Sequence, residues 1–543
     1  MFSIDQNCHS LWDVVPKLAA LGRRGHRVRH LIEDIDAAFT SMGAPAGAAE
    51  LRLARERFHR SGGADWGAAL FYTEFLGRVP VEVRDWEPLT GLKTNVLAKR
   101  LGRSVDDLYD EFSPSDNWQL IGSSYVDDRR HHRIIGDLTV AETADFVRQV
   151  MEKARADMLR AFPSSASRRR LEEWFERERA RVEPLLDELA AAPLPSLYER
   201  WMREHLPPSV EIGLSSRHFS CAAGRVGGCE LLEVFCAQYG RAAALYNEAI
   251  AEGGSPLRPL RTGDGELPFF AGFDRAGHAV RTTVFLQGGS LRIDDRAFAL
   301  APGGRLPLEQ LAAAGIDTLA SKALLLVTQI RLGPEGRPLA LPYRGSLYVP
   351  TAHLLARKLA AAGLLPGELK PVVRVRFGFL DALRSVETVI RLPDHVAAAL
   401  GQTEVPARRL GESWSDLAAE AAARVEAFRS AEGRRRWQED NCRDLLDRIE
   451  ALDRRRRELA KADPKAPELR ATWMEIRGLQ ADILDRTVRQ IDRDTQLAEI
   501  DYYDSRGALL PWCLALGGEA FYNAMIDNAE VYEEPSLGAP GNG

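Results

Sequence analysis

The chain has 543 residues, of which 45% are hydrophobic and 28% are charged, and its formal net charge at pH 7 is -6. This length exceeds what one hydrophobic core organises, so we predict two to four domains. The negative charge argues against a protein built mainly to coat nucleic acid.

Three observations bear on the cellular compartment. No stretch is apolar for long enough to span a bilayer, and the first residues, MFSIDQNCHSLWDVV, lack the basic and apolar segments of a signal peptide. Six cysteines in so long a chain do not make a disulfide framework. We therefore expect a cytoplasmic protein with reduced cysteines and no membrane partner.

Residues 1–210 are predicted to form a mostly helical N-terminal region. Apolar and charged residues alternate with helical spacing in several tracts. These tracts are 11–21, 27–39, 50–58, 139–162 and 167–189. Thr139 and Glu142 have the spacing of a capping box, which predicts where the fourth tract begins.

The segment 95–112, NVLAKRLGRSVDDLYDEF, has two interpretations. Three residues occupy positions typical of a DNA-binding helix-turn-helix, namely Ala98, Gly102 and Leu108. However, Arg103 and Glu111 stand where this motif has apolar residues, and acidic side chains on the second helix would repel phosphate. Two short packed helices, with Ser104 as an N-cap, are favoured, so nucleic acid is not an expected partner.

A polar cluster at 127–132 contains Asp127, Asp128, His131 and His132. These residue types serve in general acid–base catalysis and in metal sites with nitrogen and oxygen ligands. Adjacent histidines point in different directions on a regular element, which favours a solvated loop. His131 is the best candidate for a catalytic general base in the N-terminal half.

Four further residues raise the question of zinc: His218, Cys221, Cys229 and Cys236. Their spacing lacks the close ligand pairs of structural zinc sites. Cys229 and Cys236 lie seven residues apart on one predicted helix, so they share a face, and buried free cysteines are ordinary core residues. We therefore predict no metal site.

Residues 211–405 are predicted to form an α/β core with an antiparallel insertion at 267–300. In the insertion, apolar runs separated by Gly-containing turns indicate a small meander. The segment 320–332 fits either a strand or a helix.

The clearest unit of this core is a strand, a turn, a helix and a second strand between residues 338 and 377. The strand is predicted at 338–341, the turn at 344–346, and the second strand at 372–377. Thr351 is a candidate N-cap of the intervening helix. Such units belong to parallel sheets, where ligands bind at the ends of strands.

The predicted ligand site lies where this helix starts, because backbone amides there favour an anion. Its residues are Arg344, Gly345, Ser346, Tyr348, Thr351, Arg374 and Arg376. Arginines bind carboxylate or phosphate in a bidentate manner, although surface salt bridging is an equal alternative for these three. Alternation places Arg374 and Arg376 on one face, and Arg376 lies nearer the ligand-binding end of the strand. Gly345 has the alternative of a plain turn glycine.

Residues 406–500 are predicted to form an antiparallel helical hairpin of coiled-coil type. Apolar residues recur mostly at three- and four-residue steps on the way out and every seven residues on the way back, around a reversal at 461–467. Ser415 is a candidate cap of the first helix. An apolar seam of this kind predicts a homodimer. The chain then returns to the core at 501–532, and the Pro- and Gly-rich tail at 533–543 is predicted to be disordered.

The order of these parts resembles the bacillithiol-biosynthesis cysteine-adding enzyme family. The resemblance is carried by RPLALPYRGSLY at 337–348, the strand to Arg376, the hairpin, and the returning LPWC at 510–513, with two glycines at 517–518 and FY at 521–522. It implies a Rossmann-like core whose last βα unit leads into a coiled-coil hairpin.

The predicted function is a biosynthetic enzyme for a small polar anionic metabolite, with ligase-like formation of a carbon–nitrogen bond. One alternative is a non-catalytic dimeric scaffold that associates through the hairpin, and a weaker one is a DNA-binding regulator using 95–112. The sequence identifies no cofactor.

Overall fold

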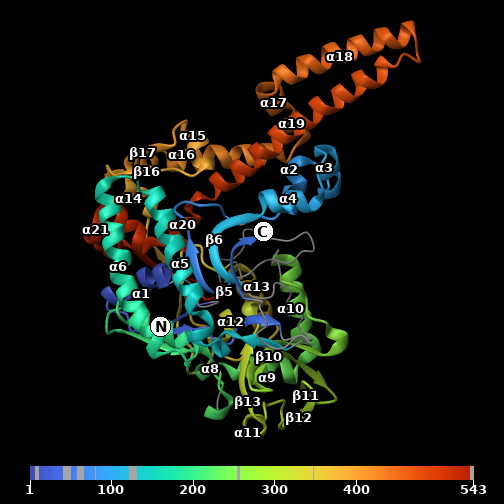
Figure 1. The fold of residues 1–543 in the computed structure, drawn as a ribbon. Helices are drawn as coiled ribbons and strands as arrows, with labels where there is room; N and C mark the ends of the chain where they lie inside the picture. Colours follow the sequence, from blue (N-terminus) through green and yellow to red (C-terminus); the bar gives the residue numbers. More distant parts are fainter. Residues whose placement is uncertain are drawn as a thin grey trace.

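The computed structural model describes residues 1–5, 11–40, 51–57, 67–79, 81–121, 131–224, 226–253, 257–346 and 348–537. The protein is a mixed α/β fold, as predicted, with parallel and antiparallel sheets. Figure 1 shows a body of sheets and helices from which a long helical hairpin projects. Among the described residues, no helix is long and apolar enough to cross a membrane.

The central element is a six-stranded sheet with the order β18-β15-β14-β1-β2-β8. Its strands are β1 (Phe2–Asp5), β2 (Val28–Ile32), β8 (Val210–Leu214), β14 (Leu339–Pro342), β15 (Val372–Arg376) and β18 (Glu530–Glu534). All neighbours are parallel except β18, which runs antiparallel to β15. The N-terminal 210 residues are therefore not a region apart from the core, because they supply two central strands.

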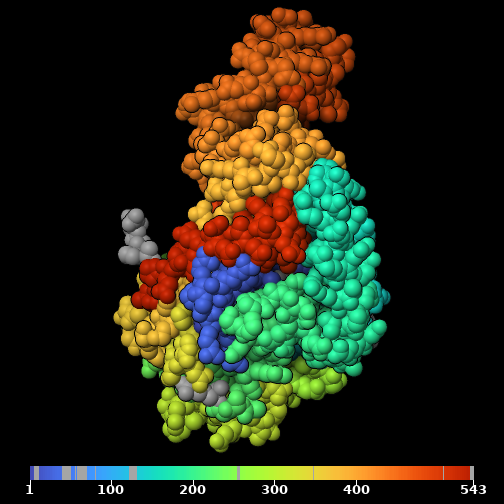
Figure 2. Space-filling model, turned by 90° about the vertical axis from the view of Figure 1, so that its left-hand side faces the viewer, coloured from blue at the N-terminus to red at the C-terminus, as the bar shows by residue number. Residues whose placement is uncertain are grey.

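Helices cover both faces of this sheet. One face packs on α1 (Leu11–Arg23), α5 (Val140–Ala161), α6 (Ser165–Glu188), α7 (Leu194–Arg203) and α21 (Leu509–Asn528). Figure 2 shows α21 in red beside α1 in blue. The other face packs on α9 (Cys229–Ala237), α10 (Tyr239–Gly253), α12 (Ala323–Gln329) and α13 (Val349–Ala361). Val373 and Val375 belong to the first core and Val372 to the second, as strand alternation requires.

A second, antiparallel sheet adjoins the second core. It consists of β3 (Ala37–Thr40), β7 (His132–Ile134), β9 (Glu266–Arg275), β10 (His278–Gln287), β11 (Ser290–Ile293), β12 (Arg296–Ala299) and β13 (Ile316–Ser321), with the short α11 (Leu308–Ala313) before β13. The predicted meander is present as β9 to β12, but three further strands extend it. The ambiguous segment 320–332 divides, since β13 ends at Ser321 and α12 begins at Ala323.

A third sheet of three strands has the order β4-β6-β5. Its strands are β4 (Arg52–Arg57), β5 (Gly67–Thr73) and β6 (Pro114–Ile121). The helices predicted at 27–39 and 50–58 are therefore wrong, because β2, β3 and β4 occupy these segments. Their charged residues fit strand alternation as well as a helical face, and pairing with distant strands decides between the two.

The segment 95–112 forms two short helices, α3 (Thr94–Leu101) and α4 (Val105–Phe112), preceded by α2 (Glu87–Thr90). Ser104 caps α4 in a capping box with Asp107, and Thr139 caps α5 in the same way with Glu142. Leu97 and Leu108 share a core with Val488 and Ile491 at the base of the hairpin. The favoured interpretation of packed helices is therefore confirmed.

The hairpin follows a short β-ladder of β16 (Val389–Arg391) and β17 (Glu404–Pro406), between which α15 (Asp394–Leu400) lies. Its helices are α16 (Ala407–Phe428), α17 (Ala431–Asn441), α18 (Arg443–Ala462) and α19 (Glu468–Ala498). The reversal lies where the prolines predicted it. Ser415 is inside α16 and caps nothing, because the first helix starts eight residues earlier.

The chain returns to the body through α20 (Tyr503–Arg506) and α21. It then adds β18 to the edge of the six-stranded sheet. The disorder predicted from residue 533 onward is wrong for Glu533 and Glu534, which pair with β15. Leu537 packs against the second core, and residues 538–543 lie outside the described residues.

Candidate functional site

The turn after β14 lies at the carboxyl edge of the six-stranded sheet. The backbone N–H of Gly345 donates to the carbonyl of Pro342 at 2.9 Å, and an added Cβ at Gly345 would lie 2.6 Å from Pro342 Cδ. This contact requires glycine. Ser346 has a left-handed φ of 63°, so it reverses the chain before α13. The predicted tight turn is therefore present.

Arg344 binds carboxylates of the chain itself. Its guanidinium pairs with Glu499 and Asp501, and its backbone N–H donates to Ser505 Oγ at 2.6 Å. The two carboxylates raise the pKa of Arg344 further, against the effect of burial. Because its acceptors come from the segment that follows the hairpin, Arg344 joins this segment to the sheet edge, and its guanidinium is not open to a ligand.

Arg374 also binds groups of the chain itself, although it lies on the predicted face. Its Nε donates to Glu534 Oε1 at 2.9 Å, and its Nη1 donates to the carbonyls of Gly345 at 2.7 Å and Pro342 at 3.1 Å. The residue is buried. Arg374 therefore links three neighbouring segments, namely β15, β18 and the turn after β14.

Arg376 differs from the other two predicted arginines. Its guanidinium carbon lies 4.7 Å from the centre of the Tyr343 ring, and in the described part of the chain no carboxylate oxygen lies within 4.0 Å of its nitrogens. It lines a small, partly open recess with an enclosed volume of about 10 Å³. The other lining residues are Tyr343, Gly378, Phe379, Leu380, Asp381, Trp414, Asp501 and Asp504. Of the three arginines, Arg376 is the one whose guanidinium makes no ion pair with a described carboxylate.

The carboxylates around this recess are largely engaged. Asp504 is buried and accepts the backbone N–H groups of Phe377 at 3.0 Å and Phe379 at 2.7 Å. Asp381 accepts from Trp414 Nε1 at 3.1 Å. These contacts fix the walls of the recess, and they leave Arg376 as the group with unused hydrogen-bonding capacity.

The helix start differs from the prediction at Thr351. Helix α13 begins at Val349 with Tyr348 in the N-cap position and Pro350 in its first turn, where proline is favoured. Thr351 lies inside the helix, and its Oγ1 donates to the carbonyl of Gly253 on α10 at 3.4 Å. The N-cap assignment is therefore wrong, and Thr351 supports helix packing. Ser346 Oγ is buried and has no hydrogen-bond partner among the described residues.

His131 belongs to the second sheet, where it directly precedes β7. Its Nε2 lies 3.1 Å from Asp294 Oδ1, and its Nδ1 lies 2.9 Å from Arg275 Nη1. Burial lowers the pKa of His131. Asp127 and Asp128, which were predicted to accompany it, lie outside the described residues.

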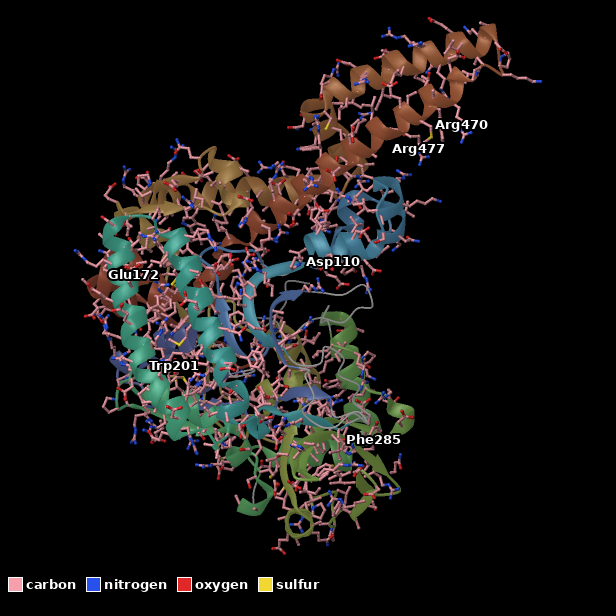
Figure 3. The ribbon with its side chains drawn as sticks, in the orientation of Figure 1. Asp110, Glu172, Trp201, Phe285, Arg470 and Arg477 are labelled. Carbon is pink, nitrogen blue, oxygen red and sulfur yellow. The ribbon has the colours of Figure 1, made fainter. Side chains whose placement is uncertain are left out.

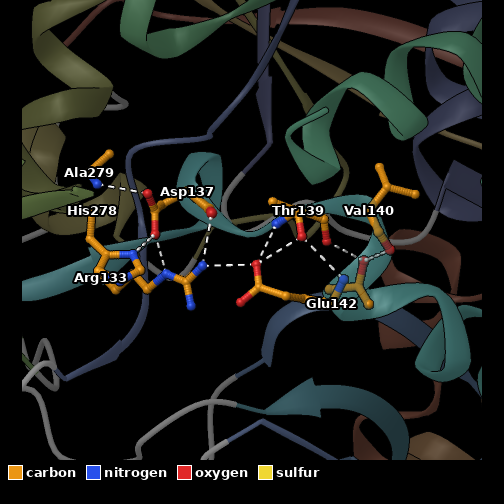
Figure 4. Close-up of polar contacts among 8 residues, drawn as sticks. Arg133, Asp137, Thr139, Val140, Glu142, His278 and Ala279 are labelled. Carbon is orange, nitrogen blue, oxygen red and sulfur yellow. Dashed lines mark hydrogen bonds and ion pairs between the residues drawn. The ribbon is translucent and has the colours of Figure 1, made fainter. Parts of the chain in front are cut away.

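Arg133 of β7, two residues after His131, has a structural role. Its guanidinium lies between Asp137 and Glu142 (Figure 4). The distance from Arg133 Nη2 to Glu142 Oε2 is 2.9 Å. Asp137 also accepts from His278 and from the backbone N–H of Ala279. This network satisfies its own charges and ties β7 to β10 and to the start of α5.

The acidic residues after β2 are a site feature that sequence reasoning missed. Asp34 is buried and accepts from Ser215 Oγ at 2.9 Å and from Ser216 at both its N–H, at 2.9 Å, and its Oγ, at 2.5 Å. Burial raises the pKa of Asp34. The signal was an acidic run, EDID, directly after the apolar strand VRHLI. Because a helix was predicted at 27–39, these acidic residues were not recognised as following a strand.

The cysteines lie in packed surroundings. Burial raises the pKa of Cys221 and of Cys236 to about 12, and the ring of His218 packs against Phe2 and Phe219. Within the described ranges, no group of three or more His, Cys, Asp or Glu side chains is arranged to hold a metal ion.

Comparisons of the chain with protein-family models, with curated proteins and with solved structures found no match.

Proposed function

We propose that the chain is an enzyme that binds a small polar anionic metabolite at the carboxyl edge of the six-stranded sheet, with Arg376 as the anion-binding residue. The order of the strands in this sheet supports the proposal. The five parallel strands lie side by side as β8-β2-β1-β14-β15. If they are numbered one to five along the chain, this order is 3-2-1-4-5, and it reverses between β1 and β14. This order is typical of Rossmann-like sheets, which bind ligands at that reversal.

The single observation that carries the proposal is the unused guanidinium of Arg376 at the carboxyl end of β15. Arginine donors match carboxylate and phosphate groups, and aromatic walls exclude water from such a contact. Tyr343, Phe379 and Trp414 supply these walls. The enclosed volume of the recess is only about 10 Å³, so the anionic end of a metabolite would meet Arg376 at the open mouth of the recess.

We further propose ligase-like formation of a carbon–nitrogen bond as the reaction. The support is the order of parts, which resembles that of the bacillithiol-biosynthesis cysteine-adding enzyme family. In this order, a βα unit with the turn Tyr343–Ser346 leads through the helical hairpin to a segment that returns to the same edge. Arg344 connects the two by its bonds to Glu499 and Asp501. His131 contacts Arg275 and Asp294 on the second sheet, so we assign it no role at this edge.

The test is native mass spectrometry of protein purified from its own host, followed by isothermal titration with the metabolite that co-purifies. Arg376→Ala should weaken binding by about 1.5–3 kcal/mol, the scale of a charge-assisted hydrogen bond. Arg391→Ala is the matched control, because Arg391 is an exposed arginine that pairs with Glu404. If a folded Arg376→Ala variant binds the metabolite with unchanged affinity, the proposed site is wrong.

A second candidate function is a dimeric scaffold that associates through a coiled-coil hairpin. Trp473 is 43% exposed and Met474 is 56% exposed, and both lie on α19 where the hairpin projects from the body. Arg470 and Arg477 flank them on the same helix (Figure 3), and the Arg477 guanidinium lies 5.3 Å from the Trp473 ring. Large apolar side chains exposed together favour an interaction surface.

A further inference from the structure

Arg331 is fully buried, two residues after the end of α12. Its Nε donates to the carbonyl of Val327 at 2.9 Å, and its Nη2 donates to the carbonyl of Ser536 at 3.3 Å. Its Nη1 is buried and has no hydrogen-bond partner in the part of the chain that the structure describes. Burial lowers the pKa of Arg331 to about 10, which leaves the guanidinium charged at neutral pH.

The surroundings of Arg331 are also cationic. His353 on α13 is 5% exposed, and its Nε2 has no partner among the described side chains and backbone groups. Burial and the positive charges of three arginines lower the pKa of His353 to about 4. The three arginines are Arg331, Arg374 and Arg357. Arg357 follows His353 by four residues on α13, so the two share a helix face.

The nearby negative charge does not balance these groups. Glu534 is the carboxylate that acts on both Arg331 and Arg374, and it is hydrogen-bonded to Arg374 Nε at 2.9 Å. The other acceptors are neutral carbonyls, since Arg357 Nη1 donates to Leu537 at 2.5 Å and Arg331 to Ser536. Among the described residues, Glu534 is thus the carboxylate beside the buried Arg331 and Arg374, and Arg374 already takes its hydrogen bond. An uncompensated buried charge is costly unless an anion pairs with it.

We propose that Arg331, His353 and Arg357, here called the Arg331 cluster, bind a phosphate-class oxyanion, either inorganic phosphate or the phosphoryl group of a metabolite. The unpartnered Arg331 Nη1 and His353 Nε2 are the donors that the anion would accept from, the latter as the N–H of a neutral imidazole. A tetrahedral dianion suits several convergent donors better than a single carboxylate does.

This site goes beyond the proposed function, because it lies under α13 and the C-terminal segment and is distinct from the recess that Arg376 lines. Residues 535–537 follow β18 and cover the cluster through their carbonyl contacts with Arg331 and Arg357. The anion would supply the charge that these carbonyls do not. It would therefore hold α13 and the C-terminal segment together.

The test is equilibrium dialysis of the full chain with inorganic phosphate at constant ionic strength. Wild type should bind about one equivalent. Arg331→Met should weaken binding on the order of tenfold or more. Arg357→Gln changes a half-buried arginine at the edge of the cluster, so it should fold and also weaken binding. Arg391→Ala should bind as wild type does. Absence of phosphate binding in wild type, or unchanged affinity in folded Arg357→Gln, overturns the site.

Three further arms assign the ligand and the location. Glycerol phosphate that competes with phosphate would identify a phosphoryl group on a metabolite as an acceptable ligand, and failure to compete would restrict the site to the free ion. Acetate that binds equally well would overturn the phosphate assignment. Arg376→Ala should retain phosphate binding. If Arg376→Ala loses it while both cluster variants keep it, phosphate occupies the recess, so this inference fails and the proposed function stands.

Discussion

Arg374 Nη1 lies 2.7 Å from the carbonyl oxygen of Gly345, 29 residues earlier in the chain. The same guanidinium holds Glu534 of β18, 160 residues later. One buried side chain therefore fixes both the turn that shapes the carboxyl edge and the strand that closes the sheet. This makes Arg374 a structural residue, although the sequence predicted a ligand contact.

Arg374→Ala should destabilise the protein by about 3 kcal/mol, because removing one partner of a buried ion pair leaves Glu534 and two carbonyls without their donor. The free energy of unfolding in urea measures this effect. Arg391→Ala, which removes an exposed ion pair with Glu404, should cost at most about 1 kcal/mol. A loss of the same size in both variants would contradict the structural role.

The raised pKa of Glu74 predicts that the stability of the protein depends on pH. Burial and the nearby carboxylates of Asp116 and Asp157 raise the pKa of Glu74 to about 8, and Arg55 at 2.7 Å only partly opposes them. Between pH 4.5 and about 8 the folded protein then holds a proton that the unfolded chain has lost. Stability should fall as pH rises through this window, by at most about 1.4 kcal/mol per pH unit.

Glu74→Gln should flatten this dependence, because the amide keeps the shape of the protonated acid and cannot ionise. Urea midpoints measured at intervals from pH 5 to pH 8 provide the comparison. Glu183→Gln is a suitable control, since Glu183 forms an exposed ion pair with Arg148. The prediction fails if wild type and Glu74→Gln lose stability equally over this range.

Self-association through the hairpin can be tested at its exposed apolar residues. The double change Trp473→Ser and Met474→Ser should convert a wild-type dimer into a monomer in analytical ultracentrifugation, because it removes exposed apolar area without touching the buried seam. Substitution of Leu452 and Ile483 by charged residues would be less informative. Ile483 is buried inside one hairpin, so a charged residue there would unfold that hairpin.

Val96→Ser is the matched control for this experiment. Val96 is also an exposed large apolar residue, but it lies on α3 in the body of the protein. It should leave the sedimentation coefficient unchanged. Wild type that sediments as a monomer at micromolar concentration would remove the dimer proposal.

Local features were predictable from the sequence because their causes are local. The capping boxes of Thr139 with Glu142 and of Ser104 with Asp107 depend on residues three apart. The reversal between α18 and α19 follows from prolines that cannot continue a helix. The alternation that puts Arg374 and Arg376 on one face of β15 is a property of any strand.

The tertiary structure decided which of these arginines is available to a ligand. Arg344 and Arg374 are taken by Glu499, Asp501 and Glu534, which lie about 160 residues away in the sequence. The tertiary structure also decided that the segments after residues 27 and 51 are strands, because β2 and β4 form only by pairing with strands from other parts of the chain. Helical caps and turns depend on neighbours in the chain, whereas ion pairs and sheet partners depend on distances that only the complete fold sets.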